Sequence, residues 1–221
     1  MKRILSIALI VLVSSFWNGS FAQINGGFKM GIDFSNLKWD IGSTSMNDQF
    51  DTKRLITPRL GFFMDVNIVE GLFANIGVYG SSKGFRYKDT RTIDGVDYDS
   101  KEYQILATID IPLNVGYRYD FGGITAFGML GPNLSYGLYA TALYKANGEY
   151  DNDHQTVGKE ISDTFKPMNF GINVEAGVEL DRFQFSAYFT QGLSELSNID
   201  AQSIKSSVFG LNVAIKFGNV E

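Results

Sequence analysis

The amino-acid sequence predicts an all-β fold: one eight-stranded antiparallel up-and-down β-barrel that spans a membrane, preceded by a cleaved signal peptide. The first observation is strict alternation of apolar and polar residues, clearest in YQILATIDIPLNVGYRYDF at residues 103–121. An ordinary strand has only about 5–6 residues. The second observation is that short turns and long polar loops alternate along the chain, and the third is that glycines gather on the polar face. Together these features are typical of barrels with short periplasmic turns and long extracellular loops.

The first residues have the pattern of a secretory signal. Lys2 and Arg3 precede an apolar core at residues 4–13, and small residues flank Phe21. This core is shorter than the roughly 20 residues that a transmembrane helix needs. We expect cleavage between Ala22 and Gln23, so that residues 1–22 are the signal peptide and residues 23–221 are the barrel domain.

Composition excludes several classes of function. The chain has 19 basic and 24 acidic residues and no basic stretch, which argues against a nucleic-acid partner. It has no cysteine and a single histidine, His154, which excludes disulfides, thiolate catalysis, iron–sulfur clusters and multi-histidine metal sites. We therefore expect no cofactor and no bound metal.

The first four predicted strands follow one another with the same alternation. In residues 26–37 and 54–68, apolar side chains occupy the even positions, and polar residues or glycine occupy most odd ones. Residues 72–79 continue this pattern, and the strand can extend to residue 93. The fourth strand, 103–121, has its apolar residues at odd positions. Because Asp94-Gly95 is a strong hairpin signal, we expect the third and fourth strands to form a ribbon that rises beyond the bilayer.

The last four predicted strands are residues 124–144, 168–180, 183–193 and 206–217. The cleanest is 168–180, where every even position from 170 to 180 is apolar. Between 144 and 168 the chain is polar and contains Asn147-Gly148, which is a second candidate hairpin tip.

The connections provide an independent signal. Short turns are predicted at residues 69–71, 122–123 and 181–182, and longer polar stretches separate them. A soluble β-sandwich has no reason to sort its loops by length, whereas an outer-membrane barrel places the short turns on the periplasmic side.

Alternation alone leaves open which face points outward, since a lipocalin-like soluble barrel turns its apolar face inward. Glycines on the polar face suit a narrow eight-stranded interior. Tyr117, Tyr119 and Phe121 gather at the short-turn end, as an interfacial aromatic girdle would. Both features favour a barrel with lipid outside, located in the cell outer membrane.

Four segments carry a family resemblance that covers nearly the whole chain after residue 22. They are GGFKMGIDFSNL, ATIDIPLNVGY, GVELDRFQFSAYFTQGLSEL and SSVFGLNVAIKFG. In this combination and order they resemble the PorT-like outer-membrane β-barrel proteins of Bacteroidota. The resemblance implies an eight-stranded outer-membrane barrel, and no residue here carries over a secretion-linked role.

Charged residues recur on the predicted inner face. An ion path or a small-ligand site is one interpretation. The interpretation that we favour is a structural, salt-bridged plug, because eight strands enclose room for side chains rather than an open pore and buried charges must pair. The predicted network contains four basic and six acidic residues: Lys29, Asp33, Arg59, Asp65, Asp110, Arg118, Asp120, Glu175, Glu179 and Lys216.

The loops offer weaker candidates for chemistry. His154 follows acidic residues in the third long loop, and some outer-membrane enzymes place histidine at this rim, but no GxSxG nucleophile motif accompanies it. The aspartates near residues 94–99 and 151–153 lack the spacing of a calcium loop. We interpret them as solvated or bridged by divalent ions to lipopolysaccharide phosphates.

The sequence therefore predicts a non-enzymatic, monomeric outer-membrane barrel with a structural or interaction role. Its expected partners are outer-membrane lipid, lipopolysaccharide and a protein at the extracellular loops or periplasmic turns. A narrow transport or secretion-associated barrel and a rim-sited enzyme remain alternatives.

Overall fold

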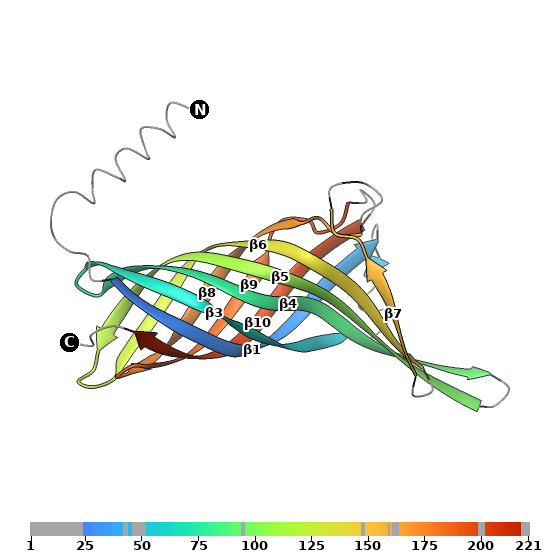
Figure 1. Cartoon of the computed structure of the whole chain (residues 1–221), viewed down its shortest axis with the longest axis horizontal. Helices are drawn as coiled ribbons and strands as arrows, with labels where there is room; N and C mark the ends of the chain where they lie inside the picture. Colours follow the sequence, from blue (N-terminus) through green and yellow to red (C-terminus); the bar gives the residue numbers. More distant parts are fainter. Residues whose placement is uncertain are drawn as a thin grey trace, which may run out of the picture.

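A computed structural model describes residues 24–41, 44–45, 52–93, 96–146, 149–158, 160, 164–198 and 202–217 of the chain. Most of these residues belong to one antiparallel sheet that closes on itself (Figure 1). No helix in the described ranges is long and apolar enough to cross a membrane. The strands are β1 (Ile24–Ile41), β2 (Thr44–Ser45), β3 (Lys53–Val69), β4 (Leu72–Ile93), β5 (Val96–Asp120), β6 (Thr125–Ala146), β7 (Glu149–Gln155), β8 (Met168–Leu180), β9 (Phe183–Gly192) and β10 (Gln202–Phe217).

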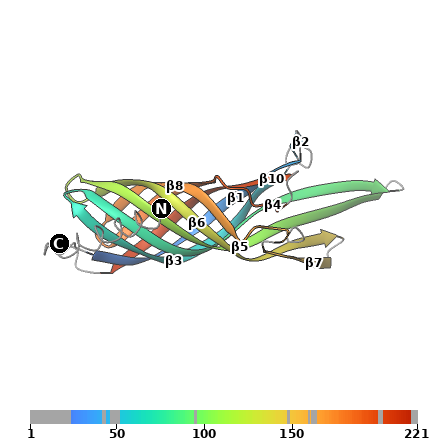
Figure 2. The same ribbon diagram turned by 90° about the horizontal axis from the view of Figure 1, so that it is seen from above.

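The ring runs through β1, β3, β4, β5, β6, β8, β9 and β10, and it closes where β1 pairs with β10. Each strand of this ring overlaps one predicted segment, which confirms the antiparallel barrel. The short β2 pairs with the end of β1, and β7 pairs with β6. Beyond the ring, β4 and β5 extend past the loop end, as the expected ribbon does, and β6 with β7 extends there too (Figure 2).

Three sets of predicted features lie outside the described residues. They are the signal peptide with its cleavage site at Ala22 and Gln23, and the two hairpin tips, Asp94-Gly95 and Asn147-Gly148. Pairing of the residues that flank the two tips is described: Ile93 pairs with Val96, and Ala146 pairs with Glu149.

The two faces of the ring are chemically opposite. Large apolar side chains point outward along the strands, with Phe62 and Leu130 each 63% exposed. Charged and amide side chains point inward and are buried, among them Lys29 and Asp33. In water this arrangement would expose a continuous apolar surface, whereas in a bilayer the outward residues contact acyl chains. The prediction that the apolar face is the outer one is correct.

Short turns join neighbouring strands at one end of the barrel. Gly71, Gly122 and Gly123 have φ angles of 75°, 83° and 111°, and side-chain-bearing residues rarely adopt such angles. In the turn between β5 and β6, the amide of Gly122 donates a hydrogen bond to Asp120 Oδ1 at 2.8 Å. These turns hold neighbouring strands in register at the periplasmic end.

The wall between β3 and β4 has an interruption. Residues 55–59 of β3 and 81–84 of β4 lack the regular pairing found on either side. Pro58 lies within this segment and has no N–H to donate. The hydroxyl of Ser35 on β1 fills part of the gap, because the amide of Gly84 donates to Ser35 Oγ at 3.0 Å. A side chain thus replaces a missing backbone contact.

Candidate functional site

The barrel interior is the candidate site because it gathers the buried charges. The structure places nine of the ten predicted network residues on the inner face, in ion pairs. Asp120 is the exception, and its predicted place in the lumen is wrong. It is exposed in the β5–β6 turn, because β5 ends there and the carboxylate accepts hydrogen bonds from the turn amides.

Sequence reasoning missed one inner charge, Lys83. It lies on β4 and its side chain is 2% exposed. On β4 the odd-numbered residues Phe73, Asn75 and Tyr79 point inward, and Lys83 is odd-numbered too. Continuing the alternation of the predicted third strand through residue 83 would therefore have found it. With Lys83 included and Asp120 removed, the described inner charges are five basic and five acidic: Lys29, Arg59, Lys83, Arg118, Lys216, Asp33, Asp65, Asp110, Glu175 and Glu179.

These charges form three layers along the barrel axis. The turn-end layer contains Arg118, Lys216, Asp65 and Glu179. Arg118 Nε donates to Glu179 Oε1 at 3.0 Å, Arg118 also pairs with Asp65, and Lys216 Nζ donates to Glu179 Oε2 at 2.6 Å. The Arg118 guanidinium lies 3.6 Å from the ring centroid of Phe73. Two cations therefore face two carboxylates.

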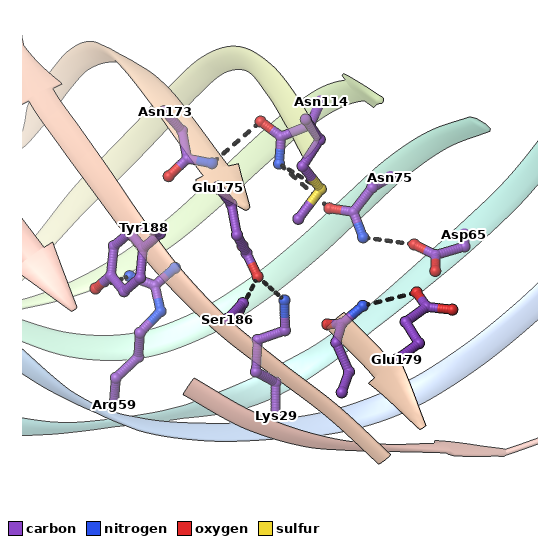
Figure 3. Close-up of polar contacts among 12 residues, drawn as sticks. Lys29, Arg59, Asp65, Asn75, Asn114, Asn173, Glu175, Glu179, Ser186 and Tyr188 are labelled. Carbon is purple, nitrogen blue, oxygen red and sulfur yellow. Dashed lines mark hydrogen bonds and ion pairs between the residues drawn. The ribbon is translucent and has the colours of Figure 1, made fainter. Parts of the chain in front are cut away.

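The middle layer is one ion pair with additional hydrogen bonding. Lys29 Nζ lies 2.5 Å from Glu175 Oε1, and both side chains are buried. The same carboxylate oxygen accepts a hydrogen bond from Ser186 at 2.6 Å (Figure 3). Lys29 Nζ also lies 5.0 Å from the ring centroid of Phe63. These contacts compensate for the cost of burying both charges.

In the loop-end layer, the cation Arg59 lies between two aromatic rings. Its guanidinium carbon is 4.2 Å from the centroid of Tyr79 and 4.5 Å from that of Tyr188. Arg59 Nη1 donates to the Tyr188 hydroxyl at 2.9 Å, and that hydroxyl donates to Asp33. A hydrogen-bonded chain therefore connects β3, β9 and β1.

The rest of the loop-end layer is the pair of Lys83 and Asp110. Lys83 Nζ lies 3.1 Å from Asp110 Oδ1 and donates to Ser135 at 2.6 Å. Ser81 donates to Asp110 Oδ2 at 2.6 Å. Because Asp110 also lies 3.6 Å from Arg59, this layer too has two cations and two carboxylates.

A chain of side-chain amides runs round the inner wall of the barrel from Asp65 of the turn-end layer (Figure 3). Asn75 donates to Asp65 at 2.7 Å, Asn114 to Asn75 at 3.3 Å, and Asn173 to Asn114 at 3.2 Å. Thr190 then donates to Asn173 at 2.8 Å. Each amide uses both its donor and its acceptor, so the chain connects β3, β4, β5, β8 and β9.

Small residues make room for the large side chains of the lumen. A Cβ on Gly210 would lie 2.1 Å from the Tyr188 ring, and one on Gly77 would lie 2.3 Å from the Tyr79 ring. Both glycines belong to the group that the sequence places on the polar, inward face. The structure adds the reason, which is that each one faces an aromatic ring that flanks Arg59.

Apolar residues pack together at the loop end of the interior. We call this group the loop-end cluster: Leu37, Phe85, Leu106, Ala140, Phe165, Leu196 and Ile204. Phe165 and Leu196 come from the loops before β8 and before β10, and backbone hydrogen bonds hold them in place. Lys166 N donates to Leu196 O at 2.7 Å, and Leu196 N donates to Ile204 O at 2.9 Å.

The predicted rim candidate, His154, lies on β7. It is exposed, and its Nδ1 shares a hydrogen bond with the hydroxyl of Tyr139. Among the described residues, the His154 ring contacts Tyr139, and neither the serine nor the carboxylate that a nucleophilic dyad needs is in contact with it. Among the described residues, no group of three or more histidine, cysteine or acidic side chains could hold a metal ion.

Comparison with known proteins agrees with this architecture. The family model described as outer membrane protein beta-barrel domain matches residues 20–198. No curated protein is detectably similar in sequence. The specific likeness to PorT-like proteins therefore stays a resemblance.

Solved structures of outer-membrane proteins are similar at low identity. OprG of Pseudomonas aeruginosa has 12% identity and a TM-score of 0.40, covering 89% of this chain and 95% of that one. Neisserial surface protein A has 17% identity and a TM-score of 0.38, with 86% and 97% covered. The attachment invasion locus protein Ail of Yersinia pestis, in complex with sucrose octasulfate, has 12% identity and a TM-score of 0.36, with 88% and 99% covered.

Proposed function

We propose that this chain, which belongs to the outer membrane protein β-barrel domain family, is a monomeric, non-enzymatic barrel with a structural or interaction role. In this proposal the lumen is closed and the parts that project beyond the loop end carry recognition. The observation that carries it is the charge balance of the interior: each of the three layers pairs equal numbers of cations and carboxylates.

An interior of this kind supports a plug rather than an ion path. A selective pore needs charges that a passing ion can contact and that water can reach. Here Lys29, Asp33 and Asp65 are each 1% exposed or less, and their partners are other side chains of the wall. The loop-end cluster adds an apolar barrier above the charged layers.

The projecting strands favour recognition outside the membrane. The β4–β5 pairing continues to Ile93 and Val96, and the β6–β7 pairing continues to Ala146 and Glu149 (Figure 1). Paired strands hold a surface in a fixed shape, and such a surface binds at a lower entropic cost than a flexible loop. A protein or glycan partner outside the cell is the ligand class that this geometry suits.

Planar-bilayer recordings test the closed lumen. We expect the wild-type barrel to show no unitary conductance, and we expect Glu175→Gln and Arg118→Met to lower stability without creating conductance. Asp120→Asn is the matched control, because it removes a charge in the turn and outside the layers. A wild-type conductance that either lumen variant changes, and the control does not, would overturn the proposal and favour a narrow transport barrel.

A further inference from the structure

The projecting strand β7 pairs along one side only. Its residues Glu149–Gln155 pair with residues 140–146 of β6, and no other strand in the described ranges pairs with β7. Each strand of the ring, by contrast, has a paired neighbour on both sides. We call the side of β7 that faces away from β6 the outer edge of β7. Strand edges of this kind present backbone N–H and C=O groups with which another chain can pair.

A β-bulge in β6 accounts for the separation of β7 from the ring. The pairing between β5 and β6 shifts register at Leu138, which is left without a partner on β5. On its other side, β6 pairs with β8 as far as Tyr136 and with β7 from Ala140 onward. Because a bulge bends the strand that contains it, β6 leaves β8 at this point. The outer edge of β7 therefore has no ring strand beside it among the described residues.

The outer edge of β7 lies outside the membrane. From Ala126 to Tyr136 the strand β6 rises about 33 Å, which spans about 25 Å of membrane at a tilt of about 40°, the height of the apolar band of such barrels. Leu130, Leu134 and Tyr136 are exposed on the outer surface within this length. Since β7 pairs with residues 140–146, it follows the band and projects from the loop end (Figure 2).

One hydrogen bond shows which backbone groups of β7 point toward the outer edge. The carbonyl of Asp153 accepts a hydrogen bond from Thr141 Oγ1 on β6 at 3.2 Å, so the backbone of Asp153 faces β6. Backbone groups of successive residues point to opposite sides of a strand. The backbone groups of Tyr150, Asn152 and His154 therefore point toward the outer edge.

The chain itself pairs with the continuation of this edge. Thr156 is the next residue with the outward orientation, and its carbonyl accepts hydrogen bonds from the amides of Thr164 at 3.0 Å and Phe165 at 3.2 Å. Val157 and Phe165 form a β-bridge beside it. An extended segment of this chain thus already pairs on the side of the outer edge, directly below β7.

Side chains on both faces hold β7 in a fixed position on β6. On one face, Gln155 and Gln104 of β5 exchange hydrogen bonds between their side-chain amides. On the other face, the rings of His154 and Tyr139 lie edge to face with their centroids 5.6 Å apart. A strand that is already held in place loses little conformational entropy when a ligand binds.

The charge of β7 indicates what kind of segment fits its outer edge. Glu149, Asp151 and Asp153 occupy alternate positions, and β7 contains neither lysine nor arginine. Asp153 is exposed and takes part in no ion pair with the described residues, unlike the carboxylates of the lumen. A second copy of β7 would bring like charges together, which is unfavourable. A basic segment is complementary.

We propose that the outer edge of β7 binds an extended segment of a partner protein outside the cell as an added antiparallel strand, and that this segment has basic residues at alternate positions. The inference rests on the proposed function, in which the projecting strands carry recognition, and it specifies the partner. Main-chain hydrogen bonds supply affinity in this mode of binding, and alternate side chains supply specificity. Here the specificity comes from opposite charges on neighbouring strands.

Fluorescence anisotropy of labelled synthetic peptides, with the folded barrel in a neutral detergent, tests the mode of binding. The probe is a peptide about as long as β7 in which lysine and threonine alternate. Two further peptides carry N-methyl groups on every lysine amide or on every threonine amide. Because only one set of amides faces β7 in an added strand, we expect one methylated peptide to bind at least ten-fold more weakly and the other to retain affinity. Equal affinity of the two would overturn the proposal.

Charge variants test the specificity. Asp151→Asn/Asp153→Asn should weaken binding of the alternating peptide roughly two- to thirty-fold, the range expected for two cross-strand pairs of opposite charge. The matched control, Glu70→Gln/Asp181→Asn, removes the same charge at the turn end and should leave binding unchanged. Both variants should keep the faster gel mobility of an unboiled, SDS-resistant barrel. Equal weakening in the two variants would overturn the proposal, because binding would then follow net charge.

The outcome can be separated from the test of the closed lumen. If none of the peptides bound while the bilayer stayed electrically silent, the inference about β7 would be wrong and the closed lumen would stand. If the barrel conducted and the alternating peptide still bound as expected, the plug would be wrong and the inference about β7 would stand. A peptide of the same composition with its lysines contiguous should bind more weakly, and equal binding would contradict the alternate spacing.

Discussion

The charged layers and the loop-end cluster fill the interior of the same barrel in two different ways. In the layers, every side chain comes from a strand, and ion pairs such as Lys29 with Glu175 fill the space. In the loop-end cluster, Phe165 and Leu196 come from loops and pack on strand residues without any charge. The difference shows what the backbone permits: strands supply side chains at fixed heights, whereas a loop can fold inward and fill what the strands leave empty.

The two regions also differ in what a single substitution does. A buried charge that loses its partner stays out of contact with bulk water and without compensation, which costs about 3–5 kcal/mol. A truncated apolar side chain leaves a smaller defect that neighbours can partly fill. Layers built from pairs should therefore be the more sensitive region, and variants of each region can test this.

Arg118→Met should have the largest effect on stability. It leaves Lys216 as the one cation facing Asp65 and Glu179 in this layer, and it removes the contact with Phe73, so we expect a loss of about 3–5 kcal/mol. Urea unfolding in lipid vesicles, followed by tryptophan fluorescence, measures it. Asp120→Asn serves as the control, and a loss for Arg118→Met no larger than that of this control would contradict the importance of the pairing.

Phe165→Ala should have an intermediate effect, about 3 kcal/mol or less, because Phe165 is buried in the loop-end cluster but comes from a loop that can rearrange. We expect faster proteolysis of the connection between β7 and β8, with the bilayer still electrically silent. Leu193→Ala, on the exposed surface, is the matched control. Conductance in Phe165→Ala would mean that the cluster, and not the charged layers, closes the lumen.

Gly210→Ala should have the smallest effect, about 1–3 kcal/mol, because the added methyl group lies 2.1 Å from the Tyr188 ring and must displace it. Gly128→Ala is the control, since a Cβ there meets nothing within 4 Å. Thermal unfolding of the two variants in detergent gives the comparison. Similar melting temperatures would show that the ring beside Arg59 can move freely.

Much of the charged interior could be predicted, and the exceptions have physical causes. Odd and even positions of a strand point to opposite faces, and this rule assigns a residue to a face only while the strand continues. Asp120 has the inward parity of Asp110 and Arg118, but the strand ends there and its carboxylate binds turn amides. Lys83 follows a polar stretch, Gly80-Ser81-Ser82, where both faces look alike in sequence. The alternation of odd and even positions therefore does not predict the face of a residue at a strand end, and within a polar run the sequence does not show which positions point inward.

The loop-end cluster was predictable only in part. Leu37 and Leu106 occupy positions of inward parity in β1 and β5, so their apolar character on the polar face is visible in the sequence. That Phe165 and Leu196 join them is not visible, because contacts between loops distant in the chain depend on how the ring closes. The amide chain from Asp65 to Thr190 likewise combines residues of five strands.

The sequence by itself determined that this protein is a barrel with lipid outside and paired charges within, because strand periodicity and turn chemistry are local properties. Only the tertiary structure decided which charge meets which. Lys29 and Glu175 are 146 positions apart in the chain. Their ion pair depends on the pairing of β1 with β10 and on the stagger of every strand between them. Partner choice in the lumen is a property of the closed ring, and no local pattern encodes it.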